Sequence, residues 1–454
     1  MSCVAFAVGT MVGAGVFVLS GLAVEKAGPA ALVSFALAGL LVLLSALSFA
    51  VVASLARQGE SGYGYVGHAL GGYWGFVTSW AFWLGGVIGA AFVLNAFGEY
   101  LHQFFVGGVP VVVWALIGAA VLTLLNLGPA SLIGRAETGL VAIKVAILGL
   151  LIVFAFIHLD RASFTPFAPH GAGRVLTTSA LLFIAYLGFN VVCNMAGDVE
   201  NPKRTVPLAI VISMGLVALV YLGVVVALLA GQLHTFTEAS VGTAAKRLMG
   251  SWGGTLIPIG ALISTLSAGN ANILGASEIM VRLAAKKEGP TVLGRMWHGH
   301  PALSVLTGAV LYVVLILSRQ TGPVVALANV AAIVAMALVN LAAARAMHRG
   351  EAGALRLPLG PVLPALGLVA ALAQLIFIGR AEVAIGLALV FAGSAIYALR
   401  RRFHHPADHA EINKALVRGD SPAQRALARQ PRPARGGAHA GSQVHESPEP
   451  ERVP

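Results

Sequence analysis

Apolar runs of roughly 20 residues, separated by short polar segments, recur along the whole chain. Each run is long enough to cross about 30 Å of hydrocarbon as an α-helix, and the runs are continuous rather than alternating as barrel strands do. The pattern predicts an all-α integral membrane protein with about twelve spans. The expected spans cover residues 1–22, 30–56, 72–104, 110–127, 138–158, 177–197, 206–231, 253–280, 302–318, 324–344, 358–378 and 381–399.

Two of these runs are interrupted. The first contains Gly9, Gly13 and Gly15, and the sixth contains Gly188-Phe189-Asn190 followed by residues 194–197. Spans one and six are five spans apart and therefore run in opposite directions, as an inverted repeat of five spans requires. Interrupted helices in corresponding halves indicate the binding site of a secondary transporter. Close packing of small residues is the alternative for the first span taken alone.

An interrupted helix in lipid has a particular chemistry. Unpaired N–H and C=O groups cost several kcal/mol each in lipid, so we expect a polar occupant at each break. One half-helix ends in free carbonyls, and the next begins with N–H groups and a partial positive charge. A zwitterion with a carboxylate and an ammonium group satisfies both ends. The breaks therefore favour a small solute such as an α-amino acid.

Composition and charge support a membrane protein. The chain is 58% hydrophobic and only 10% charged, so lipid must be its solvent. The net charge of +11 resides in loops and a tail, which argues against a nucleic-acid partner. Loops after even-numbered spans hold eleven Lys and Arg residues against seven on the other side, and residues 400–454 add ten. Both termini are therefore expected in the cytoplasm, with the protein in the cell membrane.

Two polar segments lie outside the spans. Residues 400–454 are rich in proline and charge and are expected to be a disordered cytoplasmic tail. Residues 233–249 are too polar to span, and a short lid helix over the outer mouth and an ordinary surface loop are equally favoured.

Four motifs resemble the amino acid, polyamine and organocation permeases. They are GTMVGAGVFVLSG with the following AGPAALVSFALAGLLVLLSALSF, the loop ESGYGYVGHALGGYWGF, the segment AYLGFNVVCNMAGDVENPKRTVPLAI, and GALISTLSAGNANILGAS. The resemblance implies a LeuT-type fold with spans 1–5 and 6–10 as inverted repeats and discontinuous helices 1 and 6. Residues 1–346 would form this core, 347–399 two additional spans, and 400–454 the tail.

The resemblance also implies a substrate site. The substrate carboxylate would meet the amides of Gly13, Ala14 and Gly15, and its amino group the carbonyls near Thr10 and Met11. Span six would contribute carbonyls and side chains from Phe183, Ile184, Ala185, Tyr186 and Gly188. Phe183 or Tyr186 would cap the substrate as an aromatic gate, with simple packing as the alternative for each. Residues 198–204 resemble the family's cytoplasmic signature loop, or else form a solvated turn.

Lys144 is the candidate coupling residue, because it is the one basic residue expected deep within a span. A lysine at a helix centre costs about 2.5–3.5 kcal/mol on insertion scales, so a partner or a function is expected. In the resembling family this position lies beside spans 1 and 8, where sodium-coupled relatives bind a cation. Protonation of Lys144 would replace that cation, with Ser264 and Thr265 as neighbours. Snorkelling to an interface is the alternative.

The sequence departs from the family pattern at two places. Asn190 stands where an acidic residue often follows Gly-Phe in span six, which favours a neutral substrate. The eight residues before Gly9 make the inner half of span one shorter than usual, so either the start lies upstream or the inner gate is incomplete. Asn95 in span three is a weaker candidate that faces either the substrate side chain or the packing.

These observations predict a permease that moves an α-amino acid by alternating access, with a proton as the coupling ion. An amino-acid exchanger or uniporter is the near alternative, and a membrane sensor that binds an amino acid without transport is the more distant one. No enzyme site, cofactor or metal site is expected, and the sequence gives no oligomeric state.

Overall fold

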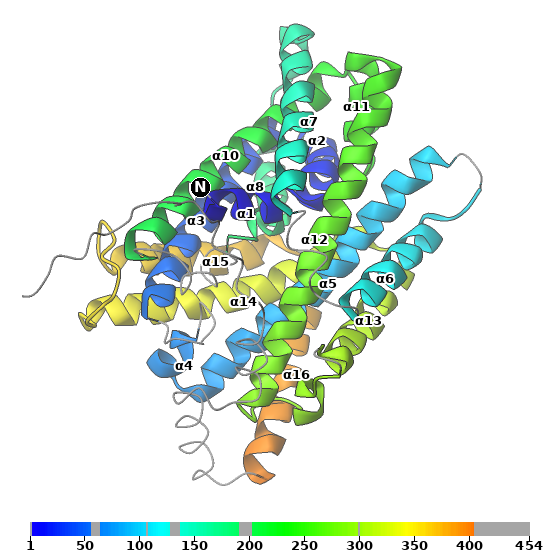
Figure 1. Ribbon diagram of the computed structural model, residues 1–454. Coiled ribbons are helices and arrows are strands. Elements are labelled where there is room, and N and C mark those ends of the chain that lie inside the picture. The colour runs from blue at the N-terminus through cyan, green and yellow to red at the C-terminus, as the bar shows by residue number, and fades with distance from the viewer. Residues whose placement is uncertain are drawn as a thin grey trace, which may run out of the picture.

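The computed structural model describes residues 2–55, 64–105, 108–127, 137–189, 202–297 and 300–403, and its regular structure there is helical apart from one isolated bridge between Trp297 and His300. The expected tail from residue 404 onward and the signature loop up to Asn201 lie outside these ranges, whereas residues 400–403 belong to the last helix. The all-α prediction is confirmed for the described part of the chain (Figure 1).

The α-helices are α1 (Ser2–Met11), α2 (Ser20–Ala27), α3 (Ala31–Leu55), α4 (Tyr65–Leu70), α5 (Gly72–Phe104), α6 (Val111–Leu127), α7 (Glu137–Ile157), α8 (Gly171–Leu181), α10 (Pro202–Ala230), α11 (Ser240–Met249), α12 (Ser251–Ala285), α13 (Ala302–Leu317), α14 (Thr321–His348), α15 (Val362–Gln374) and α16 (Arg380–Phe403). Two further helical segments matter for the site: the π-helix η1 (Gly15–Leu19), which is wider than an α-helix, and the 3₁₀-helix η5 (Leu182–Tyr186), which is tighter.

The outer surface shows that lipid is the solvent. In the described part of the chain, six helical stretches are long and apolar enough to cross a membrane, and five further apolar helices have 10–17 residues. Large apolar side chains point outward on several of them: Leu124, Leu219 and Val310 are each 68% exposed. Side chains of this kind on the outside of long apolar helices are stable only against hydrocarbon, so the protein is an integral membrane protein.

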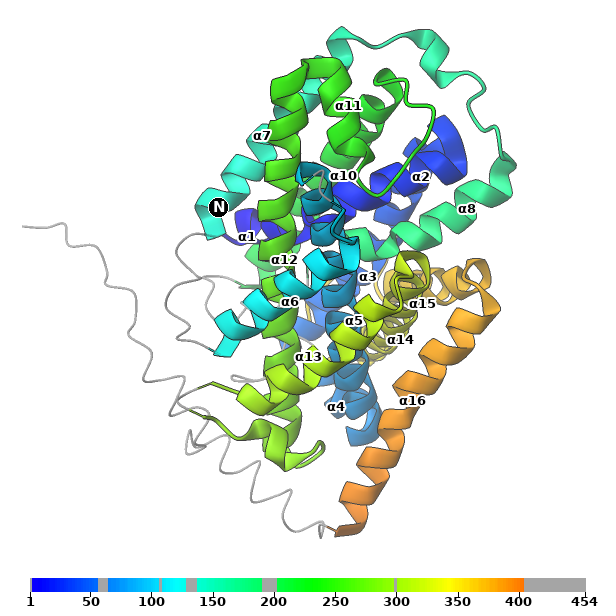
Figure 2. The same cartoon turned by 90° about the vertical axis from the view of Figure 1, so that its right-hand side faces the viewer.

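Two long helices, α5 and α12, cross near the centre of the molecule and pack against each other (Figures 1 and 2). The helices α6 and α13 lie along one side of α5, and α14 packs against another. α1 is enclosed by α7, α10 and α12. The first span, the fifth and the eighth therefore meet in space although they are far apart in sequence.

The last two helices pack onto the others. α15 lies against α3 and α14, and α16 lies against α5 and α14. The indole nitrogen of Trp80 donates a hydrogen bond to the Leu389 carbonyl at 3.1 Å, and the hydroxyls of Tyr73 and Ser394 lie 2.8 Å apart. These bonds join α16 to α5. The division of the chain at residue 346 stays a prediction.

The polar segment after α10 contains a real helix, α11. Its buried face carries Val241, Ala244, Ala245 and Leu248, while Lys246 and Arg247 are exposed. Arg247 donates to the carbonyls of Gly231 and Gln232 and so ties the helix to the end of α10. The lid helix is therefore favoured over an ordinary loop.

We predict that Gly98→Ala destabilises the protein by about 1–3 kcal/mol, because α5 and α6 are too close there for a side chain. An added Cβ would lie 2.6 Å from the Val111 carbonyl oxygen and 3.0 Å from the Ala115 nitrogen, and backbone atoms cannot rotate away. The apparent Tm of purified protein in detergent should fall. Gly149→Ala on α7 is the control, since no atom lies within 4 Å of its added Cβ. Equal Tm values for Gly98→Ala and the wild type would contradict the close approach.

A second prediction concerns Glu238, just before α11. Burial raises the pKa of this carboxyl from 4.5 to about 7. The hydrogen bond with Thr321 lowers the pKa, and the charge of Glu99 raises it further. The folded protein therefore binds a proton that the unfolded chain releases, and stability falls as the pH rises from about 4.5 through 7. Glu238→Gln should flatten the fall of Tm between pH 5 and 8. The exposed-site variant Glu25→Gln should retain the wild-type slope, and an unchanged slope in Glu238→Gln would refute the assignment.

Candidate functional site

The first span is interrupted where its glycines lie. α1 ends at Met11, and helical structure resumes with η1 at Gly15. The last regular bond runs from the Val12 N–H to the Val8 carbonyl at 2.7 Å, and the Gly13 N–H then turns back to the Met11 carbonyl at 2.8 Å. Ala14, at the start of η1, offers no side-chain cap to the N–H groups that follow. These N–H groups start a helix and therefore have no earlier partner within it.

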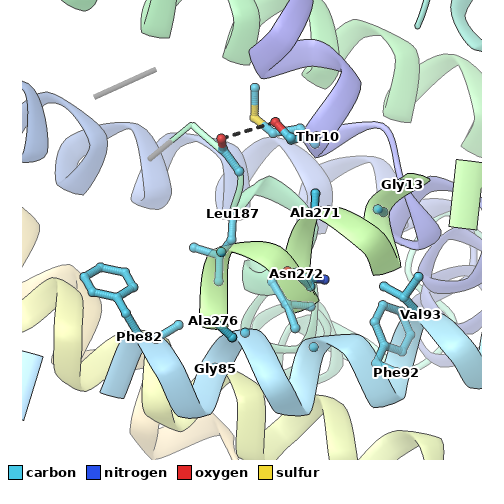
Figure 3. A pocket seen from close by; sticks show the side chains of 18 of the residues that line it. Thr10, Gly13, Phe82, Gly85, Phe92, Val93, Leu187, Ala271, Asn272 and Ala276 are labelled. Carbon is cyan, nitrogen blue, oxygen red and sulfur yellow. Dashed lines mark hydrogen bonds between the residues drawn. The ribbon is translucent and has the colours of Figure 1, made fainter. Parts of the chain in front are cut away.

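The helical part of the sixth expected span ends beside the first break. η5 ends at Tyr186, Leu187 is extended, and Gly188 has a φ of 137° that favours glycine. A Cβ at Gly188 would lie 3.0–3.2 Å from atoms of Met11 and Thr10, so glycine also permits the close approach of the two breaks. The Thr10 hydroxyl lies 3.3 Å from the Gly188 carbonyl, the bond drawn in Figure 3. Asn190 and residues 194–197 lie outside the described residues.

Hydroxyl groups of neighbouring residues meet the carbonyls at the breaks. Ser264 on α12 donates to the Val12 carbonyl at 2.7 Å. The Tyr221 hydroxyl on α10 lies 2.7 Å from both the Met11 and the Ala185 carbonyl oxygens. The expectation that an unwound backbone requires a solute is therefore corrected for the carbonyl side, because the protein supplies its own donors there.

A cavity of about 200 Å³ lies between the two breaks and the central helices (Figure 3). Eight of the ten residues expected to contact a substrate line it: Thr10, Met11, Gly13, Ala14, Gly15, Ile184, Ala185 and Gly188. α5, α12 and α14 form the remaining walls. The structure thus brings both interrupted segments to one space.

Phe183 and Tyr186, expected as an aromatic gate, do not line the cavity. Both side chains are fully buried, and the Tyr186 hydroxyl donates to the Phe35 carbonyl on α3 at 3.0 Å. The Tyr186 ring meets the Tyr221 ring edge to face at 5.1 Å. Tyr186 therefore packs against α3 and α10, and a gating role of Phe183 or Tyr186 in another state stays a prediction.

Lys144 is buried within α7, with a side chain only 1% exposed. Its ammonium donates to the Ser267 hydroxyl on α12 at 3.1 Å. The two expected neighbours use their hydroxyls elsewhere: Ser264 donates to Val12, and Thr265 donates to Ala261 in its own helix. Burial at this depth excludes the snorkelling alternative in this structure. The contact with α12 agrees with the helix that the sequence pointed to, and the hydroxyl bonded to the ammonium there is that of Ser267.

The cavity walls contain residues that sequence reasoning missed. Gly85, Gly86 and Gly89 form a smooth face on α5, and Asn272 is a polar side chain opposite (Figure 3). The cavity continues along α12 to Glu278 and Arg282, one helical turn apart. Asn272 lies in the GNAN segment, so its polarity within a span was a usable signal. Asn95 is buried away from the cavity, and its Nδ2 has no partner among the described residues.

The arrangement suits a small zwitterion. The N–H groups at the start of η1 favour a carboxylate, and the carbonyls of Met11 and Ala185 favour an ammonium group. The glycines of α5 leave room for a side chain between α5 and α12.

Comparison with known proteins agrees with this chemistry. The chain is 28% identical over 354 residues to the inner membrane transport protein YbaT of Escherichia coli (strain K12), covering 76% of this chain and 82% of the relative. It is 27% identical over 429 residues to the branched-chain amino acid permease BcaP of Bacillus subtilis (strain 168), covering 87% and 91%. It is also 27% identical over 299 residues to cationic amino acid transporter 5 of Arabidopsis thaliana, covering 62% and 52%.

The family model for amino acid permeases matches residues 3–349, which include both breaks, Lys144 and the whole cavity lining. The family resemblance drawn from the motifs is thereby confirmed. The chain belongs to the amino acid permease family of membrane transport proteins.

Proposed function

We propose that the protein is a secondary transporter that carries an α-amino acid across the cell membrane by alternating access. One observation carries this proposal: residues beside the first break and residues of the sixth expected span line a single cavity, namely Thr10, Met11, Gly13, Ala14 and Gly15 with Ile184, Ala185, Leu187 and Gly188. A site made from both breaks binds the parts that all α-amino acids share, the carboxylate and the amino group. A relative motion of the surrounding helices would then expose the same site to either side.

The helices fit a twelve-span arrangement with an inverted repeat of five spans. In this assignment α1 with α2 forms span one, α7 forms span five, α8 with η5 begins span six, α12 forms span eight, and α15 and α16 are the last two spans. The charge count places the C-terminal end of α12 in the cytoplasm. The cavity runs from the breaks toward that end, as far as Glu278 and Arg282, which supports an inward-open state.

A neutral substrate side chain fits the cavity best. Its walls near the breaks are apolar or glycine, and Asn272 adds one uncharged polar group. The acidic residue of the described lining is Glu278, which has Arg282 one turn away. A cationic side chain would find no isolated carboxylate among these residues. The relatives include both a branched-chain amino acid permease and a cationic amino acid transporter, so the proposed neutral class rests on the cavity walls.

A proton coupled through Lys144 is the proposed energy source. Lys144 and Ser267 join α7 to α12, and Ser264, one turn from Ser267, binds the Val12 carbonyl at the first break. A Cβ at Gly9 would overlap a methyl of Val141, so α1 and α7 also touch directly. Loss of the ammonium charge would weaken the bond between Lys144 and Ser267 and leave the bond between Ser264 and the Val12 carbonyl in place.

The first test is a panel of the twenty amino acids against purified protein. We expect one or a few neutral amino acids to raise the apparent Tm, since ligands that bind only the folded state stabilise it. The same amino acids should accumulate in proteoliposomes with an inward proton gradient. Stabilisation without accumulation in a preparation that retains the gradient would indicate a sensor instead of a transporter.

Lys144→Ala tests the coupling. The variant should still bind substrate and exchange it across the membrane, but proton-driven accumulation should be lost because no titrating group remains at this position. Lys144→Met, which retains most of the side-chain volume, should behave in the same way. The exposed Lys26→Ala is the control and should accumulate substrate normally. Uptake with an unchanged pH dependence in both Lys144 variants would refute coupling through this residue.

A further inference from the structure

Tyr221 holds the two breaks together from a helix that the substrate site does not include. It is fully buried on α10, outside the cavity lining, and its ring packs against Phe35 and Tyr186 at centroid distances of 5.2 and 5.1 Å. Its hydroxyl reaches the Met11 carbonyl of the first break and the Ala185 carbonyl of the sixth, both at 2.7 Å. A Cβ at Gly15 would lie 3.3 Å from this oxygen, so the hydroxyl sits just behind the cavity wall.

The two bonds cannot both be strong. A hydroxyl has one proton, so it donates fully to one carbonyl at a time although both are within reach. The Met11 oxygen also accepts the Gly13 N–H at 2.8 Å, so both of its lone pairs are used when Tyr221 points toward it. The Tyr221 proton is therefore shared between two breaks, and one acceptor is always ready for another donor.

A substrate ammonium would be that donor. Met11 and Ala185 both line the cavity, and the amino group of the proposed substrate would reach their carbonyls from there. As the ammonium approaches Met11, the hydroxyl proton can turn fully to Ala185. The number of satisfied carbonyls is then the same with and without substrate, and no buried acceptor is left unpaired.

We propose that the Tyr221 hydroxyl stands in for the substrate's amino group in the empty transporter and so allows the empty protein to complete its cycle. This inference rests on the proposed transport function. An empty carrier must pass through a state closed to water on both sides, where unpaired carbonyls at the breaks are most costly. Tyr221 removes that cost without a solute. Net uptake needs this step, whereas exchange of one amino acid for another does not.

Tyr221→Phe separates the two activities, because it removes the hydroxyl and retains the ring packing. In the loaded variant the ammonium, with three N–H donors, can serve both carbonyls, so exchange should stay within about two-fold of wild type. In the empty variant both carbonyls lose this donor, and net uptake should slow by roughly 3- to 10-fold. Both rates are measured in proteoliposomes with labelled L-leucine, with or without unlabelled L-leucine inside. If the panel selects another amino acid, that amino acid replaces leucine.

A matched control is Tyr312→Phe, which removes the hydroxyl of another buried tyrosine, bonded to Thr123 on α6 and outside the cavity lining. Tyr312→Phe should leave the ratio of the exchange rate to the net-uptake rate at its wild-type value. An equal loss of both activities in Tyr221→Phe, or no loss of net uptake, would overturn the proposal. So would a wild type that exchanges leucine but shows no net uptake.

A binding measurement keeps this inference separate from the transport function. Tyr221→Phe should lower the Tm of the empty protein more than that of the leucine-bound protein, so leucine should shift Tm further in the variant than in the wild type. 4-Methylpentanoate, which is leucine without its amino group, should not shift Tm further in the variant than in the wild type. If the wild type transports nothing, transport fails as a function, and the Tm comparison still decides the role of Tyr221. Equal leucine shifts in the two proteins would refute it.

Discussion

The structure depends on one constraint: every buried backbone group in lipid needs a hydrogen-bond partner, and two of the spans give up partners within their own helices. Three hydroxyls restore them. Ser264 serves the Val12 carbonyl, Tyr221 serves Met11 and Ala185, and Thr10 lies between the carbonyls of Ala7 and Gly188. These donors come from both halves of the chain, so the breaks are stable only when the halves are packed together. The cavity exists because glycines bring the breaks together and leave the space beside them unfilled.

A bond from a side-chain hydroxyl differs from a bond within a helix in one useful respect. A helical N–H is fixed in direction by the backbone, whereas a hydroxyl proton turns about a single bond and can serve either of two acceptors. Thr10 and Tyr221 each lie near two carbonyls, so the bonds at the breaks can be exchanged without moving the helices that carry them. Breaks stabilised in this way can admit a charged ligand and release it again, which a permanently bonded backbone does not allow.

The sequence predicted what depends on composition and position along the chain, and it failed where lateral contacts decide. Glycines in an apolar run identified both breaks, and a lone lysine identified the helix that faces α12, because each signal lies within one segment. Signals within one segment do not show which side chains of a helix face which neighbouring helix. The Ser267 hydroxyl bonds to Lys144, Tyr186 bonds to α3, and neither Phe183 nor Tyr186 lines the cavity. Tyr221 gave no signal, because a tyrosine in an apolar run resembles packing and its partner Met11 is 210 residues away.

The contacts of α12 explain how two distant events are joined. Ser264 and Ser267 are three residues apart, about 4.5 Å along a helix, and they face nearly the same direction. One binds the carbonyl of the first break and the other binds Lys144, so a single face of α12 contacts both the substrate site and the buried charge. α12 is one continuous helix of 35 residues. A shift of α1 relative to α12 therefore changes the packing around Lys144 at the same time, and a change at Lys144 alters the support of the break. The proposed coupling would then need no chain of conformational changes through the molecule, because one helix contacts both Lys144 and the first break.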